Sequence, residues 1–262
     1  MQRGFTLIEM VISIILLAVV GLFLGSVIRQ GLSIYVDSSA REALIQQGRF
    51  VTERLSRELR EAVPNSVMVN NDKTCIEFLP ITNSAIYSSL PSSLAPSTTI
   101  RLLPIEKSLA ADERLVVYPL NGKALRQAVS SAAQTAQVYS DVDFTSPNDR
   151  TMVNVTLTQP TSFERQSPAR RVYFYRTPVA FCYENNRIYR YADYGLDRED
   201  LDPSKLSELS TGVLMAENLS QASFQVAEPE LQRNGLIKIE LTFEDRGEKV
   251  EFVHNALIYN TP

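Results

Sequence analysis

The chain has 262 residues, and its 26 basic and 30 acidic side chains give a net charge of −4. This balance provides no bulk electrostatic attraction to nucleic acid. The sequence contains no nucleophile elbow, P-loop or dinucleotide-binding fingerprint, and its single histidine, His254, has no metal-ligating companion at a useful spacing. We therefore expect a protein that is not an enzyme and that needs no cofactor.

The first predicted element is an apolar helix near the N-terminus. Residues 10–28 carry no formal charge, and only Ser13 and Ser26 interrupt their apolar character. At ~1.5 Å per residue this run is roughly 28 Å long, which is enough to cross the hydrocarbon core of a bilayer. A buried core helix would show a polar stripe, and a secretory signal peptide would place its cleavage site after the apolar run, whereas Gly4 precedes it. We therefore predict a membrane-spanning helix.

The segment that leads into this helix, Q-R-G-F-T-L-I-E, resembles the N-terminus of type IV prepilins and of type II secretion pseudopilins. The resemblance implies that a membrane-bound prepilin peptidase cuts after Gly4 and methylates the new N-terminal residue, Phe5. It also implies an assembly role for the glutamate four residues further on, Glu9. Together, a basic leader, a Gly-Phe junction, a glutamate at fixed spacing and a spanning helix form a specific combination.

Glu9 is unexpected on physical grounds, because a carboxylate deep in lipid costs on the order of 2–3 kcal/mol. After cleavage, Glu9 would lie one helical turn from the ammonium of Phe5, and in a fibre it could instead meet the ammonium of a neighbour. Either partner would offset the desolvation of the carboxylate. The alternative is that Glu9 only reaches the lipid headgroups.

Gly21 and Gly25 form a G-x-x-x-G pair within the apolar run. This spacing permits close packing between helices in membranes. The two glycines can equally serve as a point where the helix loosens, since glycine lowers helix propensity by ~1 kcal/mol.

An amphipathic pattern predicts that the helix continues beyond the membrane. Pro64 ends this pattern, and Gly48 within it indicates a bend or a point of close packing. One helix over residues 5–63 would be roughly 90 Å long. Its apolar stripe consists of Leu44, Val51, Leu55, Leu59 and Ala62.

Residues 48–67, together with I-Y-V-D at 34–37 and V-H-N-A-L-I-Y-N-T-P at 253–262, are similar to the J-type minor pseudopilins and to the O minor pilin of MSHA (mannose-sensitive haemagglutinin) pilus biogenesis.

The rest of the chain predicts antiparallel strands. Residues 151–158, 170–176, 179–183, 188–192, 236–244 and 249–259 alternate or are rich in aromatic side chains, with hairpin turns at 184–187 and 245–247. Short helices are expected near 122–134 and at 203–209, where Asp202 can cap the second. We expect an α+β fold, with a leader at 1–4, a membrane helix at 5–28, its amphipathic continuation at 29–63 and a β-rich domain at 64–262.

The two cysteines, Cys75 and Cys182, lie in predicted strands. Arg3 weakly favours a cytoplasmic N-terminus, which would place the β-rich domain in the oxidising periplasm. A disulfide is the favoured interpretation there, and two buried free thiols are the alternative.

Two further clusters were considered as binding sites. An acidic loop offers oxygen ligands for calcium, but it lacks the glycine of an EF-hand loop, so we favour a solvated, helix-capping loop. Its carboxylates are Asp197, Glu199, Asp200 and Asp202. The basic and aromatic residues over 170–176, with Arg187 and Arg190, could stack single-stranded nucleic acid, but in alternating strands the rings are more often core.

The resemblance implies a minor pilin or pseudopilin in the bacterial inner membrane, with its N-terminus cytoplasmic and its domain periplasmic. The implied partners are the prepilin peptidase, other minor subunits, membrane lipid and an assembly platform, and no nucleic acid. The alternative is a tip adhesin or DNA-uptake pilin whose β-rich domain binds an external ligand.

Overall fold

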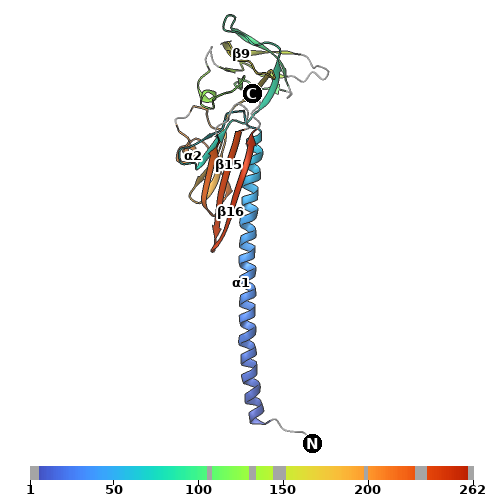
Figure 1. Ribbon diagram of the computed structural model, residues 1–262, viewed down its shortest axis with the longest axis vertical. Coiled ribbons are helices and arrows are strands. Elements are labelled where there is room, and N and C mark those ends of the chain that lie inside the picture. The colour runs from blue at the N-terminus through green and yellow to red at the C-terminus, as the bar shows by residue number, and fades with distance from the viewer. Residues whose placement is uncertain are drawn as a thin grey trace.

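The computed structural model describes residues 6–104, 108–129, 134–143, 152–197, 200–227 and 235–258. Its dominant element is the helix α1, Leu7–Arg60, whose 54 residues correspond to roughly 80 Å. Figure 1 shows that the N-terminal half of α1 projects away from the rest of the molecule and that the sheets gather around its other end. The helix ends four residues before Pro64.

The strands that follow form four antiparallel sheets. The three larger ones have the orders β1-β2-β11-β12-β13, β7-β6-β10-β3-β4-β9 and β14-β15-β16, and β5 pairs with β8. The bounds are β1 Met68–Val69, β2 Cys75–Phe78, β3 Asn83–Tyr87, β4 Ser97–Pro104, β5 Ser108–Leu109, β6 Arg114–Val116, β7 Thr135–Gln137, β8 Val142–Asp143, β9 Val153–Thr161, β10 Arg171–Tyr175, β11 Val179–Glu184, β12 Arg187–Tyr191, β13 Val213–Ala216, β14 Leu219–Val226, β15 Gly235–Asp245 and β16 Glu248–Ile258.

The C-terminal half of α1 packs against two of these sheets. One core joins the helix to β2, β11 and β12 of the five-stranded sheet and to β14, β15 and β16 of the three-stranded sheet. The predicted apolar stripe is confirmed, because every member has 3% or less of its surface exposed: Leu44, Val51, Leu55, Leu59 and Ala62. Burial of this stripe, at about 25 cal/mol per Å² of apolar surface, holds the helix on the sheets. The α+β fold, a long helix on antiparallel sheet, is confirmed.

Both predicted hairpins are present, and their turns use the left-handed backbone conformation that a tight turn between strands requires. Asn185 and Asn186, between β11 and β12, have φ values of 49° and 63°. Arg246 and Gly247, between β15 and β16, have φ values of 50° and 86°. The helix expected near 122–134 is a single 3-10 turn, Ala124–Arg126; residues 130–133 lie outside the described part.

The β-rich region contains a second core, remote from α1. After β2 the chain builds the six-stranded sheet and then returns to β11, which pairs directly with β2. The six-stranded sheet buries its own apolar cluster, which includes Leu102, Leu115, Val155 and Phe174. We call residues 79–178 the inserted unit. It lies at the end of the molecule farthest from the N-terminal half of α1 (Figure 1).

Candidate functional site

The N-terminal end of α1 carries the first candidate site. Gly4 and Phe5 lie outside the described residues. Thr6 is the N-cap of the helix, and its carbonyl accepts hydrogen bonds from the backbone amides of Glu9 and Met10. Glu9 lies exposed in the first turn. Its carboxylate has no ion pair among the described residues and is open to solvent.

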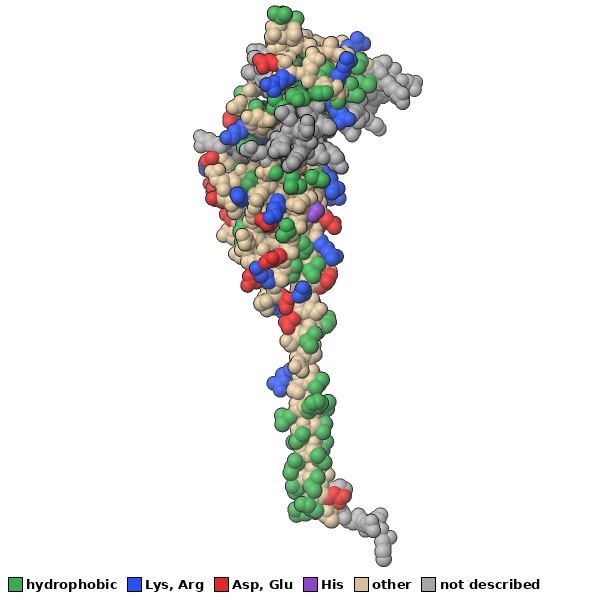
Figure 2. Space-filling model, in the orientation of Figure 1, with side chains coloured by type: hydrophobic (Ala, Val, Ile, Leu, Met, Phe, Trp, Pro, Cys, Tyr) green, Lys and Arg blue, Asp and Glu red, His purple; other side chains and the backbone are tan. Residues whose placement is uncertain are grey.

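The apolar shaft, residues 7–36, extends from this end without cover from the rest of the described residues. Figure 2 shows hydrophobic side chains along the visible face of this shaft, with an acidic side chain near its N-terminal end. The helix is long and apolar enough to span a membrane, and the apolar window that meets this test has none of its residues buried. A Cβ atom added at Gly21 or at Gly25 would meet nothing within 4 Å. The shaft is therefore a surface for lipid or for other helices.

Gly48 marks the point where α1 lies against β16. A Cβ atom at this position would lie 2.0 Å from Cε2 of Phe252. The helix continues through Gly48 without interruption, so the close-packing interpretation holds. Phe252 also packs edge-on against Phe243 of β15, with ring centroids 5.8 Å apart. Glycine is needed here because the aromatic ring occupies the space of a side chain.

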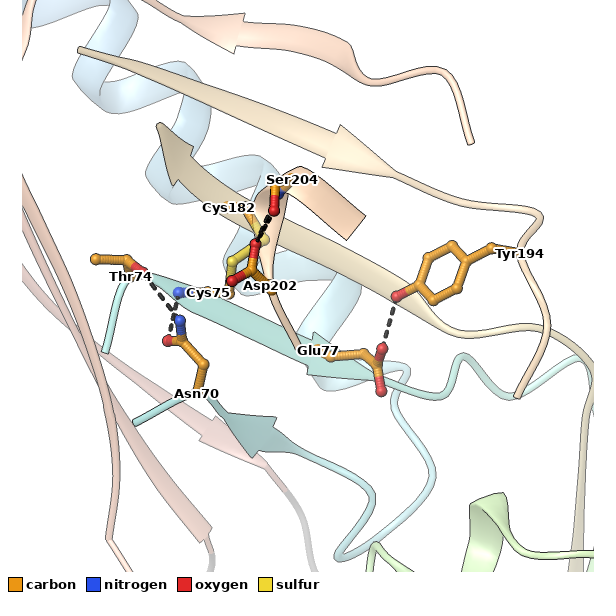
Figure 3. Close-up of a disulfide and its surroundings, with 8 residues drawn as sticks. All are labelled: Asn70, Thr74, Cys75, Glu77, Cys182, Tyr194, Asp202 and Ser204. Atoms are coloured by element: carbon orange, nitrogen blue, oxygen red, sulfur yellow. Dashed lines mark hydrogen bonds between the residues drawn. A yellow bond between two sulfur atoms is a disulfide. The ribbon is translucent and has the colours of Figure 1, made fainter. Parts of the chain in front are cut away.

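Cys75 and Cys182 form a disulfide between β2 and β11 (Figure 3). They are directly opposite each other in the register of the two strands, with Cα atoms 4.1 Å apart, and both are fully buried. The side chain of Asn70 supports this end of β2, because its Oδ1 accepts from the backbone N–H of Cys75 at 2.9 Å. The disulfide therefore joins the two strands between which the inserted unit leaves and returns.

A buried charge cluster, which the sequence analysis missed, lies at the same junction. Glu77 of β2 is fully buried, and its Oε1 accepts from Nε of Arg126 at 2.6 Å. Its Oε2 accepts from the hydroxyl of Tyr194 at 2.7 Å (Figure 3). The guanidinium of Arg126 also donates to the carbonyls of Gly122 and Ser66. Because Arg126 belongs to the inserted unit, this cluster ties that unit to β2 and to the segment after α1.

The only sequence signal for this cluster was weak. Glu77 stands within an apolar strand, C-I-E-F, where a carboxylate requires a partner if it is buried. Nothing in the sequence indicated that Arg126, far along the chain, would be that partner.

The acidic loop serves a capping role at the helix α2, Pro203–Leu209. The carboxylate of Asp202 accepts from the backbone N–H of Ser204 at 2.8 Å, which confirms the predicted cap. Hydrogen bonds from the hydroxyl and from the backbone N–H of Ser204 hold the pKa of Asp202 below its usual value. Asp200 pairs with Lys205 at 3.2 Å, and Glu199 lies outside the described residues. Within the described ranges, no three His, Cys, Asp or Glu side chains come together as a metal site.

The aromatic side chains that suggested nucleic-acid stacking belong to the core. Tyr173, Phe174 and Tyr175 of β10 are buried, whereas Arg171 and Arg176 at its ends are exposed. Burial raises the pKa of Tyr175 to about 12, and its hydroxyl donates to the carbonyl of Leu125. No ring of this strand is therefore presented to a base.

Comparison with known proteins supports the first candidate site. Residues 1–25 match the prokaryotic N-terminal methylation motif. Searches of curated proteins and of solved structures found no match to the chain. The matched segment contains Gly4, Phe5 and Glu9 and most of the apolar shaft. Together with the exposed apolar shaft, the motif supports a type IV pilin-like protein.

Proposed function

We propose that this protein is a minor pilin or pseudopilin, which a prepilin peptidase cuts after Gly4 and methylates at Phe5. It would then help to initiate or cap a type IV pilus or a type II secretion pseudopilus. The observation that carries this proposal is the N-terminal methylation motif on a helix whose apolar half is fully exposed. An uncovered apolar shaft needs lipid before assembly and other helices after it.

Glu9 is the residue that we assign to assembly. A lone carboxylate in an apolar helix bundle would be strongly destabilising, and an N-terminal ammonium offsets that cost. Its exposed position in the first turn of α1 leaves the carboxylate accessible to the ammonium of a neighbouring subunit.

The finer assignment rests on sequence resemblance. Residues 34–37, 48–67 and 253–262 are similar to J-type minor pseudopilins and to the O minor pilin of MSHA biogenesis, which favours a minor subunit over the main fibre subunit. The implied arrangement is an inner-membrane anchor with a cytoplasmic N-terminus and a periplasmic domain. A disulfide between Cys75 and Cys182 fits that oxidising compartment.

The test begins with the N-terminus of the mature protein. Mass spectrometry should find methylated Phe5 as the first residue, and Gly4→Leu should leave the precursor uncut in the membrane. Finding an intact Met1 in the wild-type protein, or a terminus beyond Gly25, would contradict the proposal.

The assembly role of Glu9 is tested in the same material. Glu9→Val should retain cleavage and membrane insertion but reduce co-isolation with other motif-bearing subunits. Ser13→Val is the matched control, because it makes the next turn of the same helix more apolar without removing the charge. Equal recovery of partners with both variants would leave Glu9 as an interfacial residue only.

The alternative function, an adhesin or a DNA-uptake pilin, is favoured by one feature. The inserted unit has its own core and lies far from the membrane helix, where an external ligand would be met. Electrophoretic shift of DNA by the intact protein at physiological salt would support the DNA-binding form of this alternative.

A further inference from the structure

A groove lies at the end of α1, beside the five-stranded sheet. It has a volume of about 300 Å³. Its walls come from the last two turns of α1, from β2 and the residues after it, and from β12. The lining residues are Arg54, Arg57, Glu58, Glu61, Phe78, Pro80 and Arg190.

The charges in this groove are unevenly paired. Glu58 is nearly buried, and it is shared between Arg54 on its own helix and Arg190 of β12, whose Nε lies 3.1 and 3.2 Å from the two carboxylate oxygens. Arg57 is exposed and has no ion pair among the described residues. Glu61 also has no ion pair among the described residues. The groove therefore contains three arginines and two glutamates, and the guanidinium of Arg57 has no ion pair among the described residues.

An exposed apolar surface borders the groove. Phe50, Arg54 and Arg57 are spaced i, i+4 and i+7, so they follow one stripe of α1. Phe50 is 54% exposed on this stripe. Val213 of the edge strand β13 is 57% exposed, and it stands opposite Arg190 in the strand register. Exposed aromatic and arginine side chains are the residue types that dominate binding energy at protein interfaces.

We infer that this surface, the groove and the apolar residues beside it, docks a second subunit that presents a carboxylate next to an apolar side chain. This inference rests on the proposed function. A guanidinium fork matches a carboxylate in a bidentate geometry, so the uncommitted charge of Arg57 selects an acidic partner. The apolar neighbour of that carboxylate would cover Phe50 and Val213.

The location of this surface on α1 indicates which kind of protein would bind to it. The surface and the apolar shaft belong to the same helix, about 20 residues apart. A subunit whose own membrane helix packs along the shaft is therefore brought close to this surface. We accordingly identify the partner as another subunit with an N-terminal methylation motif, and not as a soluble ligand.

The alternative role for Arg57 is to stabilise the C-terminal end of α1, and Arg60 provides the control for that role. Both side chains are exposed in the last turn of α1, where a positive charge stabilises the negative end of the helix dipole. Only Arg57 lines the groove. A purely structural role would therefore make the two positions equivalent.

The experiment places a photo-crosslinking amino acid at position 57, at position 60 or, as an assembly control, at position 20 of the shaft, in the full-length protein in its native membrane. Crosslinked peptides are identified by mass spectrometry. We expect positions 20 and 57 to give crosslinks to motif-bearing subunits, with a carboxylate close to the crosslink at position 57 and at least about tenfold less product at position 60.

The matching variants are Arg57→Gln and Arg60→Gln. The first should reduce recovery of the partner subunit by about tenfold and the second should not, while both have the same thermal stability. Crosslinks at position 20 alone, or equal recovery with the two variants, would overturn this inference and leave the proposed function standing. Crosslinks at none of the three positions would overturn both.

Discussion

Replacing Cys75 and Cys182 together by alanine removes the covalent tie between β2 and β11. The two cysteines are 107 residues apart in sequence. In the chain-entropy account, a crosslink that closes a loop of about 100 residues stabilises the folded state by about 4.7 kcal/mol, because it restricts the unfolded chain. The native contacts of β2 with β11 remain in the variant, since their backbone ladder does not depend on the sulfur atoms. We therefore expect a loss close to that figure with the fold retained.

The assay is urea unfolding of the processed protein in detergent, with and without a reducing agent. The wild-type protein under reduction should lose as much stability as the double alanine variant, and the variant itself should not respond to reduction. The unfolding free energy of the variant should also fall more steeply with urea concentration than that of the wild-type protein. The reason is that the unfolded chain without the crosslink exposes more surface. A loss below about 1 kcal/mol, or two titratable thiols in the denatured, unreduced wild-type protein, would refute the reasoning.

Three further predictions concern the packing of the sheets on α1 and the junction of the inserted unit. Glu77→Gln should lower the free energy of unfolding by about 3–5 kcal/mol, because it leaves the buried guanidinium of Arg126 uncompensated, and Glu77→Gln with Arg126→Met should recover part of that loss in thermal unfolding. Gly48→Ala should cost about 1–3 kcal/mol through its clash with Phe252, whereas Gly31→Ala, which meets nothing within 4 Å, should cost nothing; equal effects would contradict the close contact. Burial raises the pKa of Tyr175 to about 12, so the folded state holds the proton more tightly and stability should fall as pH rises from about 10 to about 12. Tyr175→Phe should remove that part of the pH dependence, and an unchanged alkaline profile would count against it.

The elements that the sequence predicted correctly are those whose signals are local. The stripe from Leu44 to Leu59 identifies the helix face that is buried, because the repeat of a helix brings residues of similar spacing to one side. Asn185, Asn186 and Gly247 identify the two hairpin turns, because asparagine and glycine tolerate the left-handed backbone conformation that these turns adopt. The N-terminal motif is local in the same sense.

The inserted unit could not be predicted, since it depends on a pairing between distant strands. Strand patterns indicate that β2 and β11 are strands, and the favoured Cys75–Cys182 disulfide would bring them together, but neither signal shows that the residues between them form a separate sheet with its own core. Glu77 illustrates the same limit. Its place in an apolar strand indicated that the carboxylate needs a partner. Arg126, however, lies in a segment where we expected a longer helix, and the tertiary fold alone brings the two side chains together. The groove beside Arg57 was missed for the same reason, since Arg190 reaches Glu58 from another element.

The inserted unit is fixed to the end of α1 by several contacts and not only by the two chain segments that lead into and out of it. Strands β2 and β11 alone would connect the unit through two chain segments that could flex together. Beyond the disulfide and the ion pair of Glu77 with Arg126, a small apolar cluster unites Val63, just after α1, with Leu79 and with Tyr175 of the inserted unit. These three contacts differ in chemistry and come from different parts of the junction, so a bend of the unit has to disturb more than one of them. The position of the inserted unit is therefore coupled to the end of the helix that, on our proposal, its neighbours hold in place.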